Sequence, residues 1–222
     1  MKILAVASVE KHQYDFIKEQ IANQILQPQE VLIMIDTQPA EGINNRRKRI
    51  ADNQAILESM VNKYDVDLIW QIEGDSVLPP NTLQKLVRHY RKLKNDDFGY
   101  ISGIQVGRHG LYCIGAWHIA EDRQSFESVD YRKKGLVSID ATGFYCLLAP
   151  KGVWMNGIAT WNGEMYGPDV NWGLSIRKKK YVDMDLTIGH KIKSGIIKPE
   201  DLSTCNVRFY VENDTWKFKQ YL

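Results

Sequence analysis

Two acidic residues separated by one glycine, Glu73-Gly74-Asp75, are the side chains best placed in this sequence to do chemistry. They follow the apolar run 68–70, which has the composition of a buried strand. Ligands of open α/β sheets bind at the carboxyl ends of the strands. Carboxylate oxygens held there suit Mg²⁺ or Mn²⁺, which usually share their coordination with substrate phosphates. The spacing therefore indicates a metal and phosphate site, and the alternative is a plain polar turn after a strand.

Two later segments carry further candidate groups. A glycine-rich stretch, 161–167, leads into Pro168-Asp169 and an expected helix, so Asp169 either helps this helix to start or serves as a general base in a cleft. His190 follows an expected strand and a glycine. It is either a hydrogen-bonded structural residue or a ligand that completes the metal shell begun by Asp75.

The remaining sequence predicts the elements that position these groups. Apolar runs indicate strands, and apolar residues at three- and four-residue spacing indicate helices. The expected strands are residues 3–9, 30–35, 67–72, 99–106, 112–118 and 181–188, together with a strand region at 137–149 that is interrupted by Thr142-Gly143. The expected helices are residues 14–26, 46–64, 81–93 and 170–179. Because the first strand, helix and strand form a βαβ unit, the predicted class is α/β with a mixed, mostly parallel central sheet flanked by helices.

Size and composition fit one large globular domain. The chain has 222 residues, 44% of them hydrophobic, and a formal net charge of +2, so no overall field requires a polyanionic partner. We expect a single domain, 1–222, with a nucleotide-binding half at 1–98, an acceptor and catalytic half at 99–192, and a tail at 193–222.

The three cysteines lack CxxC spacing, which argues against a zinc knuckle or a disulfide framework and favours a reducing, cytoplasmic location. No apolar run reaches the roughly 18–20 residues needed to cross a bilayer.

Taken in order, the motifs resemble those of the nucleotide-sugar-dependent glycosyltransferases of the GT-A fold, closest to the family-2-like group. The order is a first strand, a second strand ending in Asp36, acid-x-Asp after the third, the Thr-Gly-Phe segment 142–144, Gly-x-Asp before a helix, and Gly189-His190. The resemblance covers about residues 2–192 and rests on the ordered set. It implies a Rossmann-like GT-A domain with two lobes.

The resemblance also implies an activity and a role for each matching residue. The activity is metal-dependent transfer of a hexose from a nucleoside-diphosphate sugar, with UDP favoured, to an acceptor hydroxyl with inversion. The residues assigned to nucleotide-sugar binding are Ala7, Ser8, Val9, Asp36, Glu73 and Gly74, with Arg49 as a substitute for an arginine that the family carries elsewhere. Those matching the Mn²⁺ or Mg²⁺ ligands are Asp75 and His190. The base is Asp169, with Glu164 as second choice, and the acceptor side comprises Trp161, Tyr166 and Gly143.

Two departures from the family pattern leave alternatives open. Pro168 stands where an acid is usual, which leaves room for a non-catalytic module that binds nucleotide sugars. Ala51-Asp52-Asn53 lacks the arginine of the family's Ala-Arg-Asn, and Arg46 or Arg49 is the substitute. A sugar-phosphate nucleotidyltransferase is the rival enzyme class, although residues 9–13 lack the glycine-rich loop that such enzymes carry.

The acceptor and the oligomeric state stay open at this stage. A glycan, a small molecule, a protein or a hydroxymethylated DNA base are all compatible with the sequence. The basic runs 46–49 and 177–180 are either solvated helix faces or phosphate contacts. The tail 208–222 is either a packing element or an aromatic and basic surface that serves as an acceptor lid or contacts nucleic acid.

Overall fold

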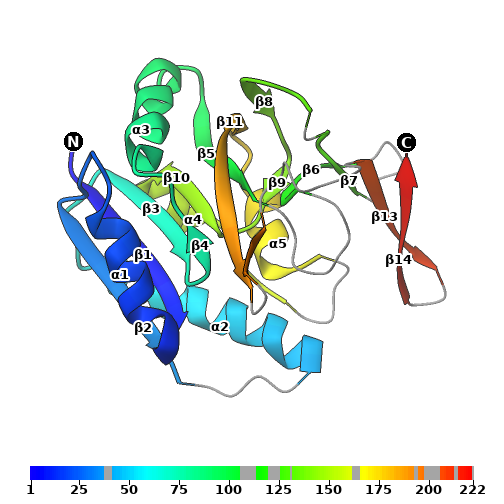
Figure 1. Ribbon diagram of the computed structural model, residues 1–222, viewed down its shortest axis with the longest axis horizontal. Coiled ribbons are helices and arrows are strands. Elements are labelled where there is room, and N and C mark those ends of the chain that lie inside the picture. Colours follow the sequence, from blue (N-terminus) through cyan, green and yellow to red (C-terminus); the bar gives the residue numbers. More distant parts are fainter. Residues whose placement is uncertain are drawn as a thin grey trace.

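A computed structural model describes residues 1–37, 42–105, 114–119, 126–130, 132–161, 166–192, 195–197, 206–212 and 215–221. Its main feature is a nine-stranded sheet with the strand order β12-β11-β5-β10-β3-β1-β2, and β4 and β8 each pair with β11 (Figure 1). The strands are β1 Ile3–Glu10, β2 Glu30–Asp36, β3 Leu68–Glu73, β4 Ser76–Val77, β5 Phe98–Gln105, β8 Leu136–Ser138, β10 Cys146–Pro150, β11 Lys179–Ile192 and β12 Gly195–Ile197.

The central sheet is mixed and mostly parallel. Strand β1 runs parallel to both β2 and β3, and β11 runs parallel to β5, whereas β10 is antiparallel to its neighbours β3 and β5. Parallel strands covered on both faces read as continuous apolar runs, which is why β1 and β3 are evident in the sequence. The predicted fold class is confirmed.

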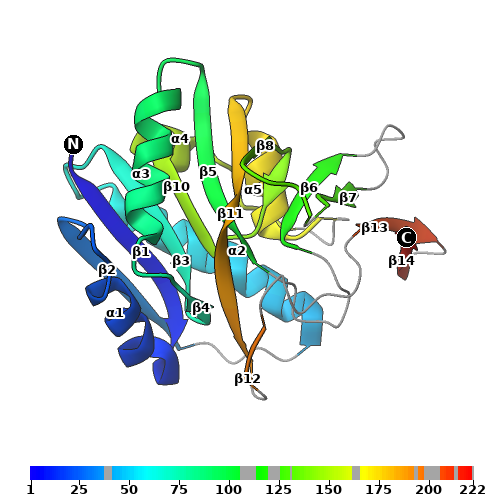
Figure 2. The ribbon, with the colours of Figure 1, turned by 45° about the horizontal axis from the view of Figure 1, so that its top comes forward.

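Helices cover both faces of this sheet (Figure 2). They are the 3₁₀ helix η1 Lys11–Gln13 and α1 Tyr14–Ala22, α2 Gly42–Val61, α3 Thr82–Leu93, α4 Lys151–Asn156 and α5 Pro168–Ser175. Alternate residues of β3 show the two layers: Ile69 packs in a cluster with Leu57 of α2, while Trp70 packs with Ile17 of α1 and Leu83 of α3. None of the helices in the described part of the chain is both long and apolar enough to cross a membrane.

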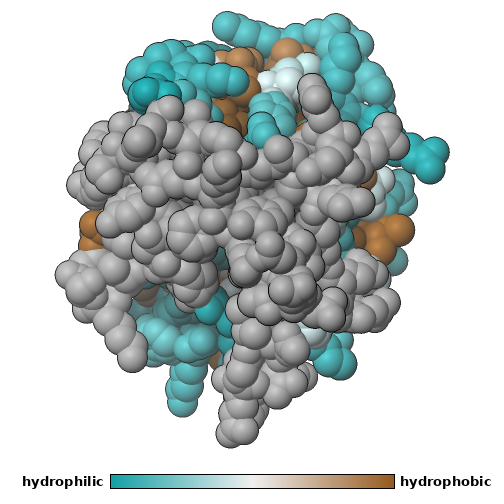
Figure 3. Space-filling view, turned by 90° about the vertical axis from the view of Figure 1, so that its right-hand side faces the viewer, coloured by the Kyte–Doolittle hydropathy of each residue, from teal (hydrophilic) through white to brown (hydrophobic). Residues whose placement is uncertain are grey.

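A second, smaller sheet lies at one end of the molecule (Figure 1). Its order is β14-β13-β7-β6-β9, and all its pairings are antiparallel. The strands are β6 Ala116–Ile119, β7 Phe126–Ser128, β9 Ala141–Thr142, β13 Asn206–Glu212 and β14 Thr215–Tyr221. On the part of this end that is coloured in Figure 3, hydrophilic residues predominate. The described parts of the tail, residues 195–197, 206–212 and 215–221, form strands β12, β13 and β14. The organisation into one domain with two lobes stays a prediction.

The expected strand region 137–149 is broken next to Thr142-Gly143, as expected, and it has a second break at residues 139–140 that was not expected. The chain forms three short strands there, because the turn at Phe144-Tyr145 separates β9, which belongs to the small sheet, from β10 in the central sheet. Thr142-Gly143 indicates the interruption, but nothing in the sequence shows that the strands on its two sides belong to different sheets. The expected strand 112–118 corresponds to β6 from Ala116 on, and residues 112–113 lie outside the described residues.

Two helix predictions also need correction. The expected helix 14–26 ends at Ala22, and Asn23 is its C-cap. The expected helix 170–179 is α5, which begins earlier and ends at Ser175, while Lys179 already belongs to β11. Strand β11 is longer than the expected 181–188 and places His190 inside a strand, because β4 and β12 give its extension hydrogen-bonding partners. The six-residue helix α4 was not predicted.

Candidate active site

The acid turn follows β3 directly and packs against the end of β1. Strand β3 ends at Glu73, and Ser8 is its partner in the neighbouring strand. A Cβ atom on Gly74 would lie 2.3 Å from Oε1 of Gln13, so any side chain at position 74 would have to displace this carboxamide. That Oε1 atom also accepts a hydrogen bond of 2.9 Å from the backbone N–H of Glu10. The glycine between the two acids thus has a packing reason.

The strand ends bring the predicted donor-binding residues to one edge of the sheet. Glu10, at the end of β1, lies opposite Asp36, the last residue of β2. Ala7 and Val9 are almost fully buried, whereas Ser8 between them keeps partial exposure. Of the three strand-tip residues, Ser8 is therefore the one accessible to a ligand.

Asp75 and His190 meet beneath this edge. Oδ2 of Asp75 lies 3.4 Å from Nε2 of His190, and each residue is only 4% exposed. The contact is built by the backbone: β4 pairs with β11 so that His190 lies opposite Ser76, and the N–H of Lys191 donates to the carbonyl of Asp75. No set of three or more His, Cys, Asp or Glu side chains within the described residues is arranged to hold a metal ion. A cation here would take two side-chain ligands, one carboxylate and one imidazole.

Asp36 is held by two residues of α2. Nε of Arg49 lies 3.0 Å from its Oδ2 atom, and Nδ2 of Asn53 donates to the same atom at 2.8 Å. Arg49 also approaches the carboxylate of Glu10, with 3.6 Å between Nη2 and Oε1. Because Arg49 and Asn53 are four residues apart, they share one helix face. Arg49 therefore lies at the predicted edge, where it bridges two strand-end carboxylates.

Asp169 sits in the first turn of α5. Its carboxylate accepts hydrogen bonds from its own backbone N–H and from that of Val170. Burial raises the pKa of Asp169 above its usual value, and these hydrogen bonds and the charge of Arg47 oppose the shift without cancelling it. The two roles predicted for Asp169 are compatible. Its carboxylate accepts hydrogen bonds from backbone N–H groups at the start of the helix, and a carboxylate with a raised pKa can also accept a proton.

Glycines crowd the Asp169 carboxylate on two sides. A Cβ on Gly167 would lie 2.6 Å from its Oδ1, and a Cβ on Gly143 would lie 3.5 Å from its Oδ2. Asp169 and Gly143, which the sequence analysis placed on the catalytic and acceptor sides, are therefore neighbours. Gly143 itself is buried.

Tyr145 connects the acid turn to this region. Its carbonyl accepts hydrogen bonds from the N–H of Glu73 at 3.3 Å and from Oγ of Ser76 at 2.7 Å. Its hydroxyl donates to the carbonyl of Gly103 at 2.9 Å. A Cβ on Gly143 would lie 2.8 Å from the Tyr145 ring. One buried tyrosine thus contacts both the acid-x-acid turn and the residue beside Asp169.

The aromatic pair flanks a segment that the structure does not describe. Trp161 and Tyr166 are both partly exposed and lie on either side of residues 162–165. The indole Nε1 of Trp161 is buried without a hydrogen-bond partner among the described residues. Glu164, the second candidate base, lies outside the described residues.

Three contributors were missed by the sequence analysis. Glu10 carries a signal, since an acid directly follows an apolar strand. Tyr145 looks like one more core residue, and only the fold shows that it joins two motifs. Arg47 lies one position from Arg46, which was singled out, and only the packing of α2 near α5 distinguishes the two.

No family model matches the sequence, and no curated protein matches it. Solved structures do match. One is A197 from STIV, which is 16% identical, covers 90% of this chain and 91% of its own, and superposes with a TM-score of 0.56. This chain has a Rossmann-like, GT-A-type fold. Another is CMP:2-keto-3-deoxy-manno-octonic acid synthetase complexed with CTP, at 10% identity, 82% and 89% coverage and a TM-score of 0.46. The first likeness establishes the fold alone.

Proposed function

We propose that this chain is a metal-dependent glycosyltransferase that moves a hexose from a uridine-diphosphate sugar to an acceptor hydroxyl with inversion. One observation carries the proposal. Asp75 and His190 are distant in the sequence, yet they meet at 3.4 Å beneath the sheet edge where Asp36 and Glu73 also end their strands. A transferase that binds a metal diphosphate needs this convergence, and a plain polar turn does not.

Asp75 and His190 would hold the metal. One carboxylate oxygen and one neutral imidazole suit Mn²⁺, and Mg²⁺ is an alternative. When bound, the cation would stabilise the negative charge that grows on the leaving diphosphate. Water and phosphate oxygens would have to supply the other ligands, because no group of three or more His, Cys, Asp or Glu side chains among the described residues could hold the metal.

The strand-end residues would hold the nucleoside. Ser8, Asp36 and Glu73 present a hydroxyl and two carboxylates at one edge, and hydroxyl groups of a ribose can donate to such acceptors. Arg49 fixes the carboxylate of Asp36 before any ligand arrives. A site that is already ordered loses less free energy on binding.

Asp169 would act as the base. An acceptor hydroxyl placed beside Gly143 would donate its proton to the Asp169 carboxylate as it attacks the anomeric carbon. Attack from the face opposite the diphosphate gives inversion. Glu164 is retained as the second choice of base, and Trp161 and Tyr166 are proposed to stack on the acceptor or the sugar.

The basic run 46–49 gives little support to a DNA acceptor. Arg49 pairs with Asp36, Lys48 pairs with an acid one turn later in α2, and Arg47 acts on the proposed base. We therefore place a glycan or small-molecule hydroxyl ahead of a hydroxymethylated DNA base. A salt-dependent gel shift with duplex DNA would reverse that order.

A cytoplasmic location is part of the proposal. Three cysteines without CxxC spacing are typical of a reducing compartment, and Cys146 is a free, buried thiol. Fractionation of the native cells is the test, and recovery of the protein from an oxidising compartment would contradict it.

The experiment is a thermal-shift screen of nucleotides and nucleotide sugars with and without Mn²⁺, because only ligands of the native state raise Tm. Donors that bind are then incubated with Mn²⁺, and the release of nucleoside diphosphate is measured. We expect UDP-sugar binding and slow hydrolysis that Asp75→Asn abolishes. Full activity in that variant contradicts the proposal. Release of pyrophosphate from a nucleoside triphosphate and a sugar phosphate would instead identify a nucleotidyltransferase.

A further inference from the structure

Gln71 is a carboxamide in the middle of a buried apolar strand. It is 5% exposed, and the residues on either side of it in β3 are apolar and buried. Its partners in the neighbouring strands are Val6 and Leu147. Burying an amide without hydrogen bonds costs about 1–3 kcal/mol, so a leucine would suit an ordinary core position better. The position therefore calls for a specific set of partners.

Those partners come from two different helices. Nε1 of Trp154 in α4 donates to Oε1 of Gln71 at 2.7 Å, and Nε2 of Gln71 donates to Oε1 of Gln54 in α2 at 3.0 Å. Trp154 is fully buried and Gln54 is 3% exposed. Gln71 thus ties α2 and α4 to the centre of the sheet.

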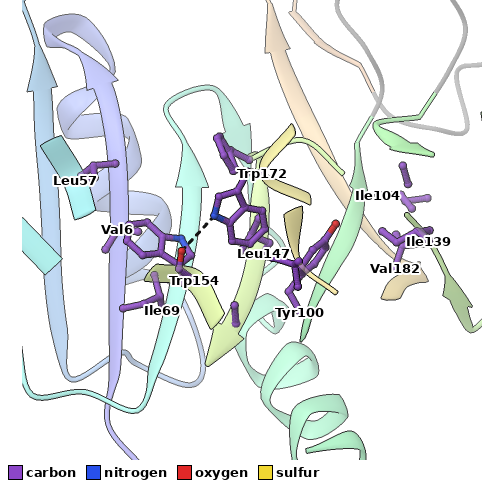
Figure 4. Close-up of a cluster of buried hydrophobic side chains, with 14 of the residues drawn as sticks. Val6, Leu57, Ile69, Tyr100, Ile104, Ile139, Leu147, Trp154, Trp172 and Val182 are labelled. Carbon is purple, nitrogen blue, oxygen red and sulfur yellow. Dashed lines mark hydrogen bonds between the residues drawn. The ribbon is translucent and has the colours of Figure 1, made fainter. Parts of the chain in front are cut away.

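The connection continues from α4 to α5. Nε1 of Trp172 donates to the carbonyl of Trp154 at 3.3 Å (Figure 4). That carbonyl lies in the last turn of α4 and also accepts the backbone N–H of Gly157 at 3.4 Å. The indole of Trp172 also packs against the rings of Tyr100 and Phe144, with centroids 5.2 and 5.6 Å away.

The Trp154 carbonyl and the rings of Tyr100 and Phe144 form a slot around the indole of Trp172, and Gly157 closes a further side of it. A Cβ added there would lie 2.0 Å from the indole nitrogen, so the backbone itself forms the wall. Trp172 follows Asp169 by three residues, which places the two about one turn apart on the same helix. The slot therefore fixes the rotation of α5 and with it the direction of Asp169.

We propose that Gln71 is a positioning residue for Asp169. Gln71 holds the indole of Trp154 by a hydrogen bond and so holds the Trp154 carbonyl, to which Trp172 donates. Trp172 in its slot then sets the rotation of α5, which directs Asp169 toward Gly143. The significance of this position for catalysis rests on the proposed function of Asp169, whereas the positioning itself does not. A residue that served only the stability of the core would leave Asp169 unaffected when replaced.

The test compares Gln71→Met with Gln24→Met. Gln24 is a matched control: it is 4% exposed and uses its carboxamide to bind the carbonyl of Pro79 and the N–H of Leu83, on the α1 and α3 side of the sheet. We expect Gln71→Met to lower kcat about tenfold with the donor KM within about twofold, because small misplacements of a catalytic group are costly. Gln24→Met should leave kcat unchanged.

A second readout needs no activity. Carboxyl NMR of labelled aspartate gives the pKa of Asp169, assigned with Asp169→Asn. In Gln71→Met this pKa should fall toward the ordinary value as a less constrained α5 admits water, and in Gln24→Met it should stay raised. If the wild type shows no transfer with any donor, the proposed function fails, and this titration still decides the positioning of Asp169.

Trp154→Phe provides the same test without touching the sheet, since it keeps a ring and removes the N–H donor. It should reproduce the effects of Gln71→Met, and the double variant should be no worse than either single one. The inference is overturned if Gln71→Met and Trp154→Phe both keep the wild-type kcat and Asp169 titration, or if Gln24→Met changes them equally.

Discussion

Asp36 and Asp169, which the proposed function assigns to one site, have different surroundings in the fold. Asp36 ends a strand, and Arg49 and Asn53 both contact one of its oxygens, at 3.0 and 2.8 Å. Asp169 begins a helix, where backbone N–H groups and the charge of Arg47 only partly offset the effect of burial on its pKa. One carboxylate has a cation directly against it, and the other is held where taking up a proton is made easier.

This difference fits the distinct tasks that the proposed function gives to the two acids. A carboxylate locked by a guanidinium and an amide is a fixed acceptor, suited to hydrogen bonds from a ligand. A carboxylate whose pKa is raised by burial is suited to accept a proton during a reaction. Under the proposed function, the same residue type would serve binding at the strand ends and chemistry at the helix start.

The largest expected effect is that of Asp169→Asn. Loss of the base should lower kcat by about 10²–10⁴-fold with little change in donor KM. Steady-state kinetics with saturating Mn²⁺ checks this. If Asp169→Asn raised the donor KM and preserved kcat, Asp169 would be a binding residue like Asp36, and its role as the base would be contradicted.

The same variant has a predicted stability effect of the opposite sign. Because folding raises the pKa of Asp169, this group stabilises the fold below its unfolded pKa, near about 4, and that contribution is lost as pH rises through the folded pKa. Asn carries no charge and can still accept the backbone hydrogen bonds. Asp169→Asn should therefore have a higher Tm than the wild type at pH 7 and no advantage at pH 3. A lower Tm at pH 7 would contradict the assignment.

Arg49→Lys tests the other acid. A lysine offers a single charged point and cannot reproduce the two contacts that Arg49 makes with Asp36 and Glu10. We expect donor KM to rise about tenfold with kcat nearly preserved, and stability to fall by about 1–3 kcal/mol because the pair is largely buried. Lys48→Arg, on an exposed pair of the same helix, is the control and should change neither quantity. If Arg49→Lys lowered kcat and left the donor KM unchanged, the binding role of Asp36 would be contradicted.

The smallest steric change that reaches both sides of the site is Gly143→Ala. The added Cβ would lie 2.8 Å from the Tyr145 ring and 3.5 Å from the Asp169 carboxylate. It should cost about 1–3 kcal/mol in stability and lower kcat more than it raises donor KM. Gly152→Ala, where the added atom meets nothing within 4 Å, is the matched control. Equal behaviour of the two variants would show that the region beside Asp169 is open.

The pH dependence of kcat sharpens the comparison further. Since the base must be unprotonated, the acid limb should lie above the pH at which an ordinary aspartate titrates. Measuring the binding of Mn²⁺ and of the donor at each pH distinguishes protonation of the base from loss of the metal. An acid limb at the ordinary aspartate value would contradict the role of burial.

Much of the fold could be predicted from the sequence, because its signals are local. The apolar runs of β1 and β3 and the amphipathic pattern of α3 specify these elements without reference to the rest of the chain. Asp36, Glu73 and Asp75 were found for the same reason, since Asp36 and Glu73 end their strands and Asp75 follows the second of them. The α/β class was confirmed, and the residue roles stay predictions.

What could not be predicted depends on contacts between distant segments. His190 was expected after the end of a strand, but it lies within β11, which is extended by pairing with the two-residue strand β4. Tyr145 and Gln71 look like core positions until their hydrogen-bond partners are known. No local pattern encodes such partners, because each lies in another element that only the tertiary fold brings near.

The central claim is that Asp75 and His190 hold the cation that binds the donor diphosphate. Calorimetric titration of Mn²⁺ into the protein saturated with UDP tests it most directly, with Asp75→Asn and a variant at the solvent-exposed Asp65 measured in parallel. The account predicts one Mn²⁺ site in the wild type and in Asp65→Asn, and its loss in Asp75→Asn while the protein remains folded. Unchanged Mn²⁺ affinity in Asp75→Asn would contradict it.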